Sequence, residues 1–412
     1  MNHVIDAMSH IIVVGAGPAG AATAFLLAQR GIQVTLLDQE PTFERVFRGE
    51  GLMPSGIDAL YQMGLSGCFE RIPSRALDAW DFYVDRQRRM RVPEPKHDKM
   101  ERAPRIVSQS ALLQLIVEQI QHQPSFRFLP GWQVRALIQT EAGVAGVRAT
   151  HQNQEHDFRG DLVIAADGRY SRLRKLASLS LEYAQTQFDV LWFKLPAPAE
   201  LLEETVFTAC LQWQRQFALY PSWDKRLQIG WIVEKGQGKK MQARDWIEEF
   251  AQAVPAPLAE YFRQHRQELE GPIFLDVVVG LCPEWSIPGL LLVGDAAHPM
   301  APNRAQGINM ALRDAIVTAN HLVPMLYRPW TPTEMNAVLR VIQTERLPEI
   351  RAIQELQLAE WERIAYFWSN RLTYIQFKLL MTLFGRFPIA QNAWLKQQEG
   401  LRHGILPVKL NI

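Results

Sequence analysis

The sequence GAGPAG at positions 15–20 stands between a β-rich run and an alanine-rich run. His10–Val14 is typical of a short strand, whereas Ala19–Gln29 favours a helix. Glycines at such a junction permit a tight turn and a close approach between the helix and the strand. This feature predicts an α/β fold that opens with a strand, a tight turn and a helix.

The spacing around this turn predicts a dinucleotide site. Gly15 would allow the turn, Gly17 would let the backbone approach a pyrophosphate, and Gly20 would let the helix lie on the strand. The free N–H groups at the helix start favour negative charge. A second strand, Val34–Leu37, ends at Asp38, about 20 residues after the glycines, where a carboxylate meets ribose hydroxyls.

An apolar stretch of this length near the N-terminus is also the right size for a signal peptide or a membrane-spanning helix. The leader MNHVIDAMSH lacks the positively charged region that a signal peptide needs. The glycine pattern and the acid after the second strand therefore favour dinucleotide binding.

Length and composition limit the number of domains and the kinds of partner and metal site that this chain can have. A length of 412 residues predicts two or three domains, and a net charge of +1 gives no reason to expect nucleic acid as a partner. The 3 cysteines have no CxxC spacing, which argues against a disulfide framework and a thiol-ligated metal and suits a reducing cytoplasm. The 10 histidines form no HExxH motif, so no metal site is expected.

Two further segments have a strand followed by a polar turn. Residues 161–175, DLVIAADGRYSRLRK, contain a buried-strand run that ends at Asp167-Gly168, although an ordinary turn is an equal alternative. In residues 289–315 a strand at Leu290–Val293 is closed by Gly294-Asp295, and Gly307-Ile-Asn309 opens a helix. A carboxylate there can accept hydrogen bonds from ribityl or ribose hydroxyls, and the helix start can stabilise negative charge on a ring.

The order GxGxxG, DGxxSxxR and GDAAHxxxP resembles the single-component FAD-dependent aromatic monooxygenases related to p-hydroxybenzoate hydroxylase and the ubiquinone-pathway hydroxylases. The matching positions are Gly15, Gly17 and Gly20; Asp167, Gly168, Ser171 and Arg174; and Gly294, Asp295, Ala296, Ala297, His298 and Pro302. The resemblance implies a Rossmann-like FAD-binding domain, an interleaved antiparallel-sheet substrate domain and a C-terminal helical region. It is strong in the FAD-binding parts and weak in the tail.

The resemblance also implies a set of FAD contacts. The pyrophosphate would lie on Gly15, Gly17, Ala19 and Gly20, the adenosine ribose on Asp38, and the ribityl chain or pyrophosphate on Gly294 and Asp295. Arg48 would reach over the cofactor, Gln109 would contact the flavin, and Asp167 and Gly168 would meet both FAD and the nicotinamide. The isoalloxazine would be lined by Pro302, Gly307, Ile308 and Asn309.

The pattern along the chain divides into three parts. The expected FAD-binding domain is discontinuous, the substrate domain is a β-sheet, and the rest is helical. The FAD-binding domain is expected to comprise residues 1–75, 101–180 and 272–330. The substrate domain would comprise residues 76–100 and 181–271, and the helical region residues 331–412. Within the substrate domain, 82–92 is expected to form one strand and Phe188–Val233 a separate antiparallel sheet.

In the implied reaction, NAD(P)H reduces the flavin, and a flavin C4a-hydroperoxide hydroxylates or epoxidises an aromatic or polyene small molecule. Trp213, Arg215 and Phe217 would alternate onto one strand face and, with Trp192 and Trp231 of neighbouring strands, could share a face over the flavin. A packed sheet core is the alternative for each. Tyr220 is a further candidate, and no catalytic base is identified. Arg304 stands where many relatives carry small glycines and could contact the substrate or the electron donor.

Two other functions remain open. A flavin-dependent reductase or dehydrogenase of the geranylgeranyl-reductase kind shares the same fingerprints, and a flavoprotein could bind a ligand without turnover. A flavin-dependent halogenase is not supported, because Pro283 stands at the first tryptophan position of the WxWxIP motif.

The tail segment 364–387 is aromatic and apolar but is interrupted by Asn370, Arg371 and Lys378, so a transmembrane anchor is not expected. Three interpretations stay open: packing on the FAD domain, an oligomer contact, and weak association with a membrane surface. The expected protein is cytoplasmic or peripheral to a membrane, and monomeric or a homodimer.

Overall fold

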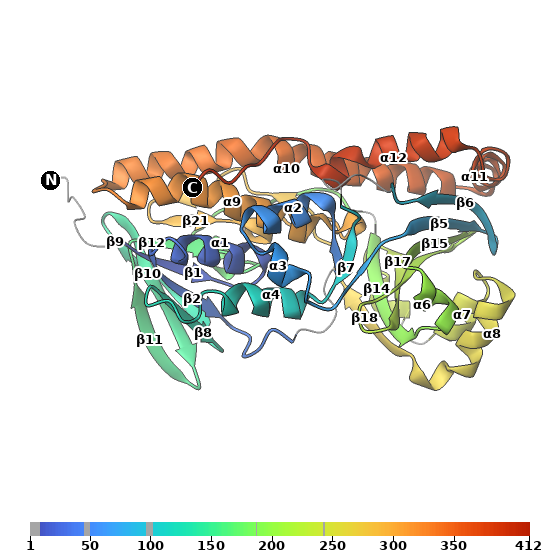
Figure 1. The fold of residues 1–412 in the computed structure, drawn as a ribbon, viewed down its shortest axis with the longest axis horizontal. Helices are drawn as coiled ribbons and strands as arrows, with labels where there is room; N and C mark the ends of the chain where they lie inside the picture. Colours follow the sequence, from blue (N-terminus) through green and yellow to red (C-terminus); the bar gives the residue numbers. More distant parts are fainter. Residues whose placement is uncertain (1–8, 45–49, 96–101, 187, 242–243) are drawn as a thin grey trace.

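The computed structural model describes residues 9–44, 50–95, 102–186, 188–241 and 244–412. Figure 1 shows a parallel sheet at one end of an elongated molecule, a larger sheet at the other end, and long C-terminal helices that run past both. The predicted α/β fold class is confirmed. The boundaries of the three predicted parts remain a prediction.

The first sheet is built on the strand that precedes the glycine-rich turn. Its order is β20-β21-β12-β1-β2-β8, and all neighbours are parallel except β20 and β21. The strands are β1 (His10–Val14), β2 (Gln33–Asp38), β8 (Phe126–Pro130), β12 (Leu162–Ala165), β20 (Ser286–Ile287) and β21 (Leu290–Leu292). Because parallel strands end at the same edge, the turns after β1, β12 and β21 lie together.

Short apolar side chains explain how helices cover this sheet. In α1 (Pro18–Ala28) all 10 residues after Pro18 are buried and 6 of them are alanine or glycine, so the helix is enclosed almost all round. It packs against the sheet and against α9 (Gln306–Leu326). The predicted strand, turn and helix at the start of the chain are confirmed.

The second sheet has the order β18-β14-β17-β16-β15-β5-β6 and is antiparallel except for the parallel pair β15 and β5. Its strands are β5 (Ala79–Val84), β6 (Gln87–Pro93), β14 (Phe188–Pro196), β15 (Val206–Gln212), β16 (Arg215–Pro221), β17 (Arg226–Glu234) and β18 (Glu270–Leu275). One face packs on α7 (Trp246–Ala251) and α8 (Ala256–Gln264). We call this the outer face and the opposite one the inner face.

The expected single strand over 82–92 is wrong. The chain forms a hairpin of β5 and β6, in which Asp85 and Arg86 make the turn with φ of +48° and +67°. Positive φ at two successive residues is the geometry of a two-residue hairpin turn, which usually contains glycine or asparagine. The Asp-Arg pair lacks that signal, so the sequence pattern does not reveal the turn.

Smaller sheets complete the fold. A three-stranded antiparallel sheet joins β9 (Gln133–Thr140) to β10 (Gly143–His151) and β11 (Gln154–Arg159), two strands that the sequence patterns did not reveal. A second three-stranded sheet has the order β3-β7-β4, formed by Gly51–Leu52, Arg105–Val107 and Ser74–Ala76. The β3 strand leads into α2 (Pro54–Gln62), and β7 leads into α4 (Gln109–Glu118).

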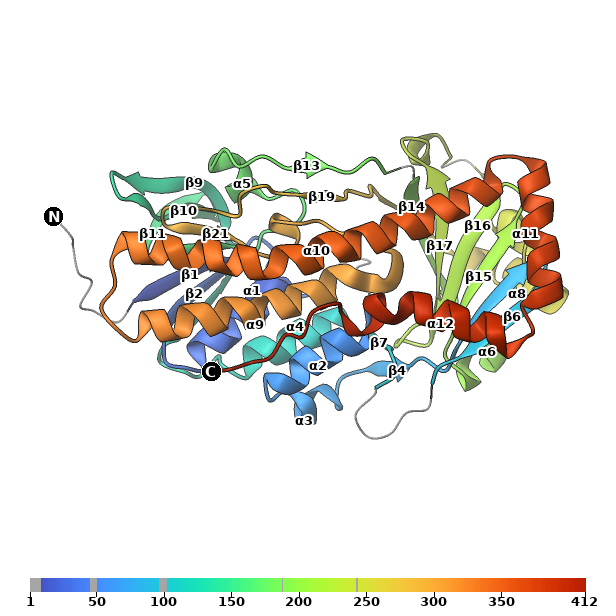
Figure 2. The same cartoon turned by 90° about the horizontal axis from the view of Figure 1, so that it is seen from above.

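The C-terminal region is helical, as predicted. Figure 2 shows α10 (Pro332–Trp368) beside α9 and extending towards the second sheet, where α11 (Arg371–Phe384) and α12 (Pro388–His403) follow. Contacts join α10 to α9, α11 to β6, and α12 to both α2 and β6. Among the described residues, the helices lack a segment long and apolar enough to cross a membrane.

Candidate cofactor and substrate site

The glycine-rich turn has the geometry of a phosphate-binding turn. Gly15 has a φ of +102°, and a Cβ atom on it would lie 2.3 Å from the Ala166 carbonyl oxygen. A Cβ on Gly20 would lie 1.8 Å from the Gly15 carbonyl oxygen, so the helix can approach only without a side chain. At Gly17, no described atom lies within 4 Å of the Cβ position. The turn is therefore closed on the sheet side and open at Gly17.

Asp38 lies at the carboxyl end of β2, beside this turn. It is 5% exposed, and its carboxylate accepts hydrogen bonds from the backbone N–H groups of Ala16, at 2.5 Å, and Glu40, at 2.8 Å. These contacts hold the acid against the glycine-rich turn. Gly17 is the N-cap of α1, and within the described residues no side chain caps that helix start. Its N–H groups therefore remain suited to an anion.

The DGxxSxxR segment folds back on itself. The Asp167 carboxylate accepts hydrogen bonds from Ser171 Oγ at 2.5 Å and from the backbone N–H groups of Arg172 and Leu173 at 2.7 and 3.0 Å. Burial raises the pKa of Asp167, although these hydrogen bonds oppose the shift. The carboxylate thus closes the start of the short helix α5 (Arg172–Leu176). Gly168, with a φ of +81°, forms the turn itself.

Arg174 joins the second motif to the third. Its side chain is buried, and its guanidinium donates hydrogen bonds to the carbonyl oxygens of Ala296 at 2.7 Å and Arg169 at 3.0 Å. Arg169 in turn lies 3.8 Å from the Asp295 carboxylate. The second and third motifs, more than a hundred residues apart in the chain, are therefore in direct contact in the fold.

Asp295 follows β21 at the edge where β1 and β12 also end. Its side chain is 27% exposed, and its Oδ1 lies 3.4 Å from the position of a Cβ on Gly307, at the start of α9. The third motif thus places a carboxylate beside a helix N-terminus. Gly294, whose φ is +60°, approaches Ala19 so closely that a Cβ would lie 2.8 Å from the Ala19 side chain.

The turn between Pro302 and α9 has an unusual backbone. Arg304 and Ala305 both have positive φ, +59° and +52°, a conformation that favours glycine. Hydrogen bonds hold it: Gln306 Nε2 donates to the Arg304 carbonyl oxygen, and Asn309 Nδ2 donates to that of Ala305. The structure therefore holds two residues other than glycine in a conformation that glycine adopts more readily.

Arg304 itself is directed towards the C-terminal helices. Its guanidinium forms an ion pair with Glu360 of α10, at 2.5 Å, and lies over the rings of Trp80 and Trp394 at 4.7 and 4.9 Å. Asn309 is fully buried, and its Oδ1 accepts a hydrogen bond from the Met53 N–H at 2.9 Å. These contacts fix the turn between α2, α10 and α12. A substrate contact for Arg304 stays a prediction.

The other predicted cofactor positions are placed as follows. Pro302, Gly307 and Ile308 lie in or directly after this turn, with Ile308 buried. Gln109 is the first residue of α4, whose N-cap is Ser108. Arg48 lies outside the described residues.

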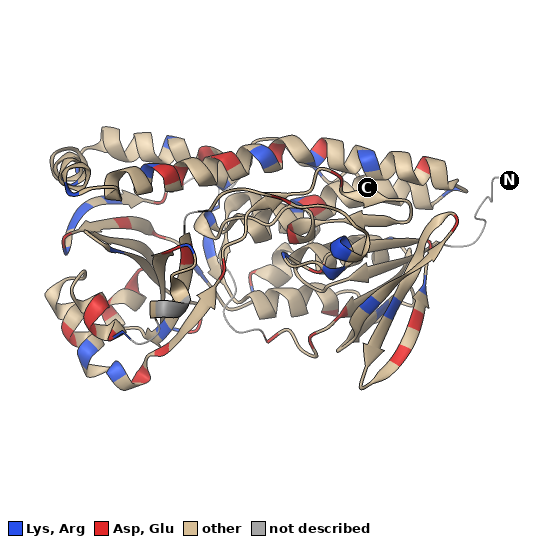
Figure 3. Ribbon diagram, turned by 180° about the vertical axis from the view of Figure 1, so that it is seen from behind, with Lys and Arg blue, Asp and Glu red and all other residues tan. Residues whose placement is uncertain are grey.

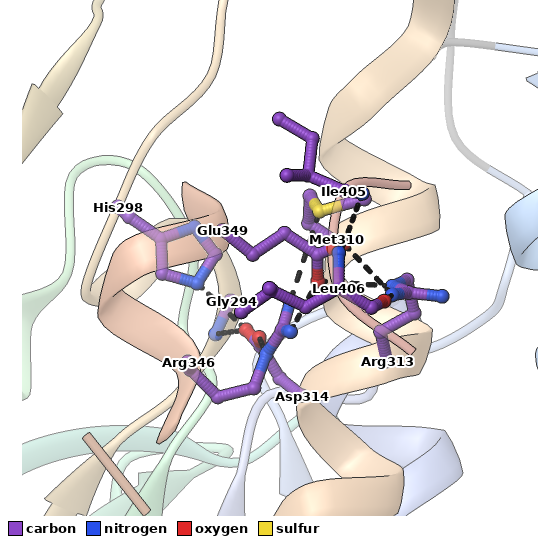
Figure 4. Close-up of polar contacts among 9 residues, drawn as sticks. All are labelled: Gly294, His298, Met310, Arg313, Asp314, Arg346, Glu349, Ile405 and Leu406. Atoms are coloured by element: carbon purple, nitrogen blue, oxygen red, sulfur yellow. Dashed lines mark hydrogen bonds and ion pairs between the residues drawn. The ribbon is translucent and has the colours of Figure 1, made fainter. Parts of the chain in front are cut away.

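A buried network of charges lies beneath the GDAAH turn (Figure 4). The Asp314 carboxylate accepts hydrogen bonds from the Gly294 N–H at 3.0 Å, from His298 Nε2 at 2.7 Å and from Arg346 Nε at 2.8 Å. Burial alone would raise the pKa of Asp314, but His298 and Arg346 lower it below its usual value. The acid is therefore ionised at neutral pH and holds the turn to both α9 and α10.

Glu349 extends this network to the end of the chain. Its carboxylate binds the guanidinium groups of Arg346 and Arg313 and accepts a hydrogen bond from the Ile405 N–H at 2.9 Å. Arg313 also donates to the Leu406 carbonyl oxygen. The sequence motif includes His298 but gives no signal for Glu349, which lies in a helix with no motif around it.

The predicted shared face of sheet residues is wrong. Trp192 pairs with Gly230, whereas Trp231 pairs with Leu191, so the two tryptophans project from opposite faces. Phe217 stacks on Trp231, with ring centres 5.3 Å apart, inside the core beneath α7 and α8.

The remaining predicted substrate residues lie in different parts of the second sheet. Arg215 Nε donates to Glu249 of α7 at 2.9 Å, on the outer face. Trp213 lies in the turn before β16, where its ring packs 5.7 Å from that of Tyr374. Only Trp192 and Tyr220 of the proposed sheet residues lie on the inner face, with ring centres 6.5 Å apart. A substrate contact for these two stays a prediction.

Sequence reasoning missed Glu50, which lies directly before β3. It is 7% exposed, and its carboxylate accepts hydrogen bonds from Ser222 Oγ at 2.7 Å and Gln228 Nε2 at 3.0 Å. Burial raises the pKa of Glu50, although both hydrogen bonds and Lys194 oppose the shift. The available sequence signal was an acid two residues after Arg48, in a segment expected to contact the cofactor.

We expect Arg346→Met to destabilise the protein by about 3–5 kcal/mol, because it leaves two buried carboxylates without their shared cation. Urea unfolding followed by circular dichroism measures the change. Arg328→Met is the matched control, because its ion pair with Glu334, at 2.9 Å, lies at the surface. Similar unfolding midpoints for the two variants would contradict the assigned role of the network.

Comparison with known proteins places this geometry in a family. A family model described as FAD binding domain matches residues 8–353. The chain is 30% identical over 371 residues to 6-methylpretetramide 4-monooxygenase of Streptomyces rimosus, covering 87% of this chain and 86% of the relative. It is 26% identical over 374 residues to a 3-amino-4-hydroxybenzoate 2-monooxygenase of Streptomyces platensis, covering 86% and 88%.

A solved structure of another monooxygenase has the same fold. The crystal structure of p-nitrophenol 4-monooxygenase from Pseudomonas putida DLL-E4 superposes with a TM-score of 0.78 at 16% identity, covering 98% of this chain and 100% of that one. The three motif turns, their shared sheet edge and the family match agree. The chain therefore belongs to the FAD binding domain family and is an FAD-dependent monooxygenase.

Proposed function

We propose that this monooxygenase hydroxylates a small aromatic molecule at the inner face of the second sheet, with NAD(P)H as the electron donor. The observation that carries the proposal is that the three motif turns meet at one sheet edge, where Arg174 joins the second turn to the third. The inner face, with Trp192 and Tyr220, lies on the side away from α7 and α8. Relatives named as monooxygenases of aromatic compounds favour oxygenation over reduction or simple ligand binding.

The chain's own residues fit FAD. The open position at Gly17 and the uncapped start of α1 would hold the pyrophosphate, and Asp38 would bind the adenosine ribose. Asp295 would bind the ribityl chain beside the start of α9. The turn between Pro302 and Asn309 would line the ring.

When bound, FAD would pass electrons from NAD(P)H to dioxygen and would transfer one oxygen atom to the substrate. The protein's part is to position the ring, to exclude water and to present the substrate. The turn that would lie against the ring is held by Asn309 on Met53 and by Arg304 on Glu360, so its shape does not depend on a ligand.

We further propose that α11 brings this enzyme to an anionic lipid surface. Residues 363–398 contain no Asp or Glu, and their cations are Arg363, Arg371, Lys378, Arg386 and Lys396. Exposed apolar side chains gather on α11, in the turn after it and at the start of α12: Leu372, Ile375, Leu379, Leu380, Leu383, Phe384, Phe387 and Ile389. Figure 3 shows further basic residues on β6, the strand that α11 contacts, and these are all arginines.

An apolar helix face with basic residues around it is the pattern of an interfacial helix. Lys378 is partly engaged, because its Nζ lies 2.6 Å from the Asp85 carboxylate. Leu372 and Ile389 are 74% and 78% exposed, which would be unfavourable in water without a partner for the face. A lipid surface would bury these side chains and would also supply a route for an apolar substrate.

The proposed reaction predicts a defined response to the electron donor. Protein loaded with FAD should lose its yellow colour with NADPH or NADH under nitrogen, and should consume oxygen when air and an aromatic substrate are present. Absorbance and an oxygen electrode measure the two steps. Reduction without oxygen uptake would instead indicate a reductase, and a protein that stays yellow would indicate a ligand-binding flavoprotein.

Gly17→Val should abolish FAD binding, because the side chain would fill the space next to the backbone that a pyrophosphate needs. The flavin-to-protein absorbance ratio of the purified protein measures occupancy. Gly67→Val is the matched control, because a Cβ there also meets open space. Equal FAD occupancy in the two variants would contradict the assigned phosphate site.

Flotation with liposomes tests the membrane proposal. We expect the protein to float with phosphatidylserine vesicles at low salt, and less at high salt, because salt screens the basic residues. Leu379→Glu/Leu383→Glu should abolish flotation, whereas Gln264→Glu/Gln267→Glu adds the same charge on or just after α8 and should not. Failure to float, with a dimer in sedimentation that the leucine variant dissolves, would assign the face to a second copy.

A further inference from the structure

Gln228 is a buried amide at the centre of the inner face. It lies on β17, where its cross-strand neighbours are Lys194 on β14 and Tyr220 on β16. Two positions along β17, Gly230 makes room for the Trp192 ring, since a Cβ there would lie 3.0 Å from Trp192 Cζ3. Gln228 is thus surrounded by the two aromatic side chains that remain candidates for substrate contact.

The nitrogen of the Gln228 amide forms a hydrogen bond, whereas its oxygen has no partner among the described residues. Its Nε2 donates to Glu50 Oε1 at 3.0 Å, and a carboxylate can only accept, which fixes the orientation of the amide. Gln228 is 2% exposed, and its Oε1 has no hydrogen-bond partner among the described residues. A buried acceptor of this kind costs about 1–3 kcal/mol unless a donor satisfies it.

Glu50 is held independently of Gln228, which makes it a firm support. Its second oxygen, Oε2, accepts from Ser222 Oγ at 2.7 Å. The charges around the amide are two acids and one base: Lys194 Nζ lies 2.7 Å from Asp224 Oδ2 and 3.9 Å from Glu50 Oε1. This cluster therefore holds two carboxyl groups and one ammonium group, so its acids outnumber its base.

We propose that Gln228 Oε1 accepts a hydrogen bond from a hydroxyl or amino group of the aromatic substrate, and that Glu50 positions the amide for this contact. The inference rests on the proposed function and names the class of substituent that the site selects. The acceptor favours a donor-bearing ring, and the excess of acids in the cluster disfavours a carboxylate at the same position. Gln228 would contact the substrate, whereas Glu50 acts through Gln228.

Two probes with the same aromatic ring system, substituted at the same position, test the proposal: 2-naphthol, which carries a hydroxyl, and 2-naphthoate, which carries a carboxylate. Binding to the oxidised, FAD-loaded enzyme is measured from the perturbation of flavin absorbance, without an electron donor. We expect 2-naphthol to bind the wild type at least about tenfold more tightly than 2-naphthoate. Equal affinities, or no binding of 2-naphthol, would overturn the proposal.

Variants separate recognition from folding. Gln228→Leu should weaken 2-naphthol binding by at least about tenfold, whereas Gln216→Leu, on the same sheet face in β16, should not. Glu50→Gln keeps the shape of the support but removes its charge, so the preference for 2-naphthol over 2-naphthoate should shrink. Unchanged affinity in Gln228→Leu, or an unchanged preference in Glu50→Gln, would contradict the assignment.

FAD content and unfolding midpoint are recorded for each variant, and if Gln228→Leu does not fold, the Glu50→Gln preference decides alone. Because binding is measured without NAD(P)H, this result does not depend on whether the enzyme oxygenates its substrate. Loss of oxygen uptake with intact probe selectivity would contradict the proposed function only. Normal oxygen uptake without selectivity would contradict the role of Gln228 only.

Discussion

The carboxylate of Asp314, on α9, binds two separate parts of the chain inside the protein, the GDAAH turn and α10. It receives the Gly294 N–H from the turn after β21, His298 from the same motif, and Arg346 from α10. An ionised carboxylate is costly to bury, so each partner is needed to compensate for lost hydration. The position of the GDAAH turn relative to the helices therefore depends on this one group.

Further buried contacts connect this turn and its helices to the end of the chain and to the second motif. Arg346 and Arg313 share Glu349, which also binds the backbone at Ile405, so the tail after α12 is fixed against α10. On the other side of the turn, Arg174 binds the Ala296 carbonyl oxygen. A site assembled from turns far apart in sequence is thereby held by buried polar contacts, which gives it a defined shape before any ligand binds.

Sequence patterns predicted local elements well where one signal dominated. The run from His10 to Ala28 has a strand period, a glycine turn and a helix-forming run, and all three agree with the fold. The hairpin at Asp85 and Arg86 was missed because its turn uses residues that seldom adopt positive φ. The faces of the second sheet were assigned wrongly because alternation within one strand says nothing about the register of its neighbour.

The sequence by itself determined the cofactor class, since the glycine turn and the acid after β2 form a local dinucleotide-binding pattern and the two later motifs resemble those of FAD-dependent monooxygenases. It could not determine what faces the substrate. Whether Trp192 or Trp231 lies on the inner face depends on strand register, and Glu50 meets Gln228 only because β3 packs near β17 in three dimensions. Such contacts join residues more than a hundred positions apart, so only the tertiary structure decided them.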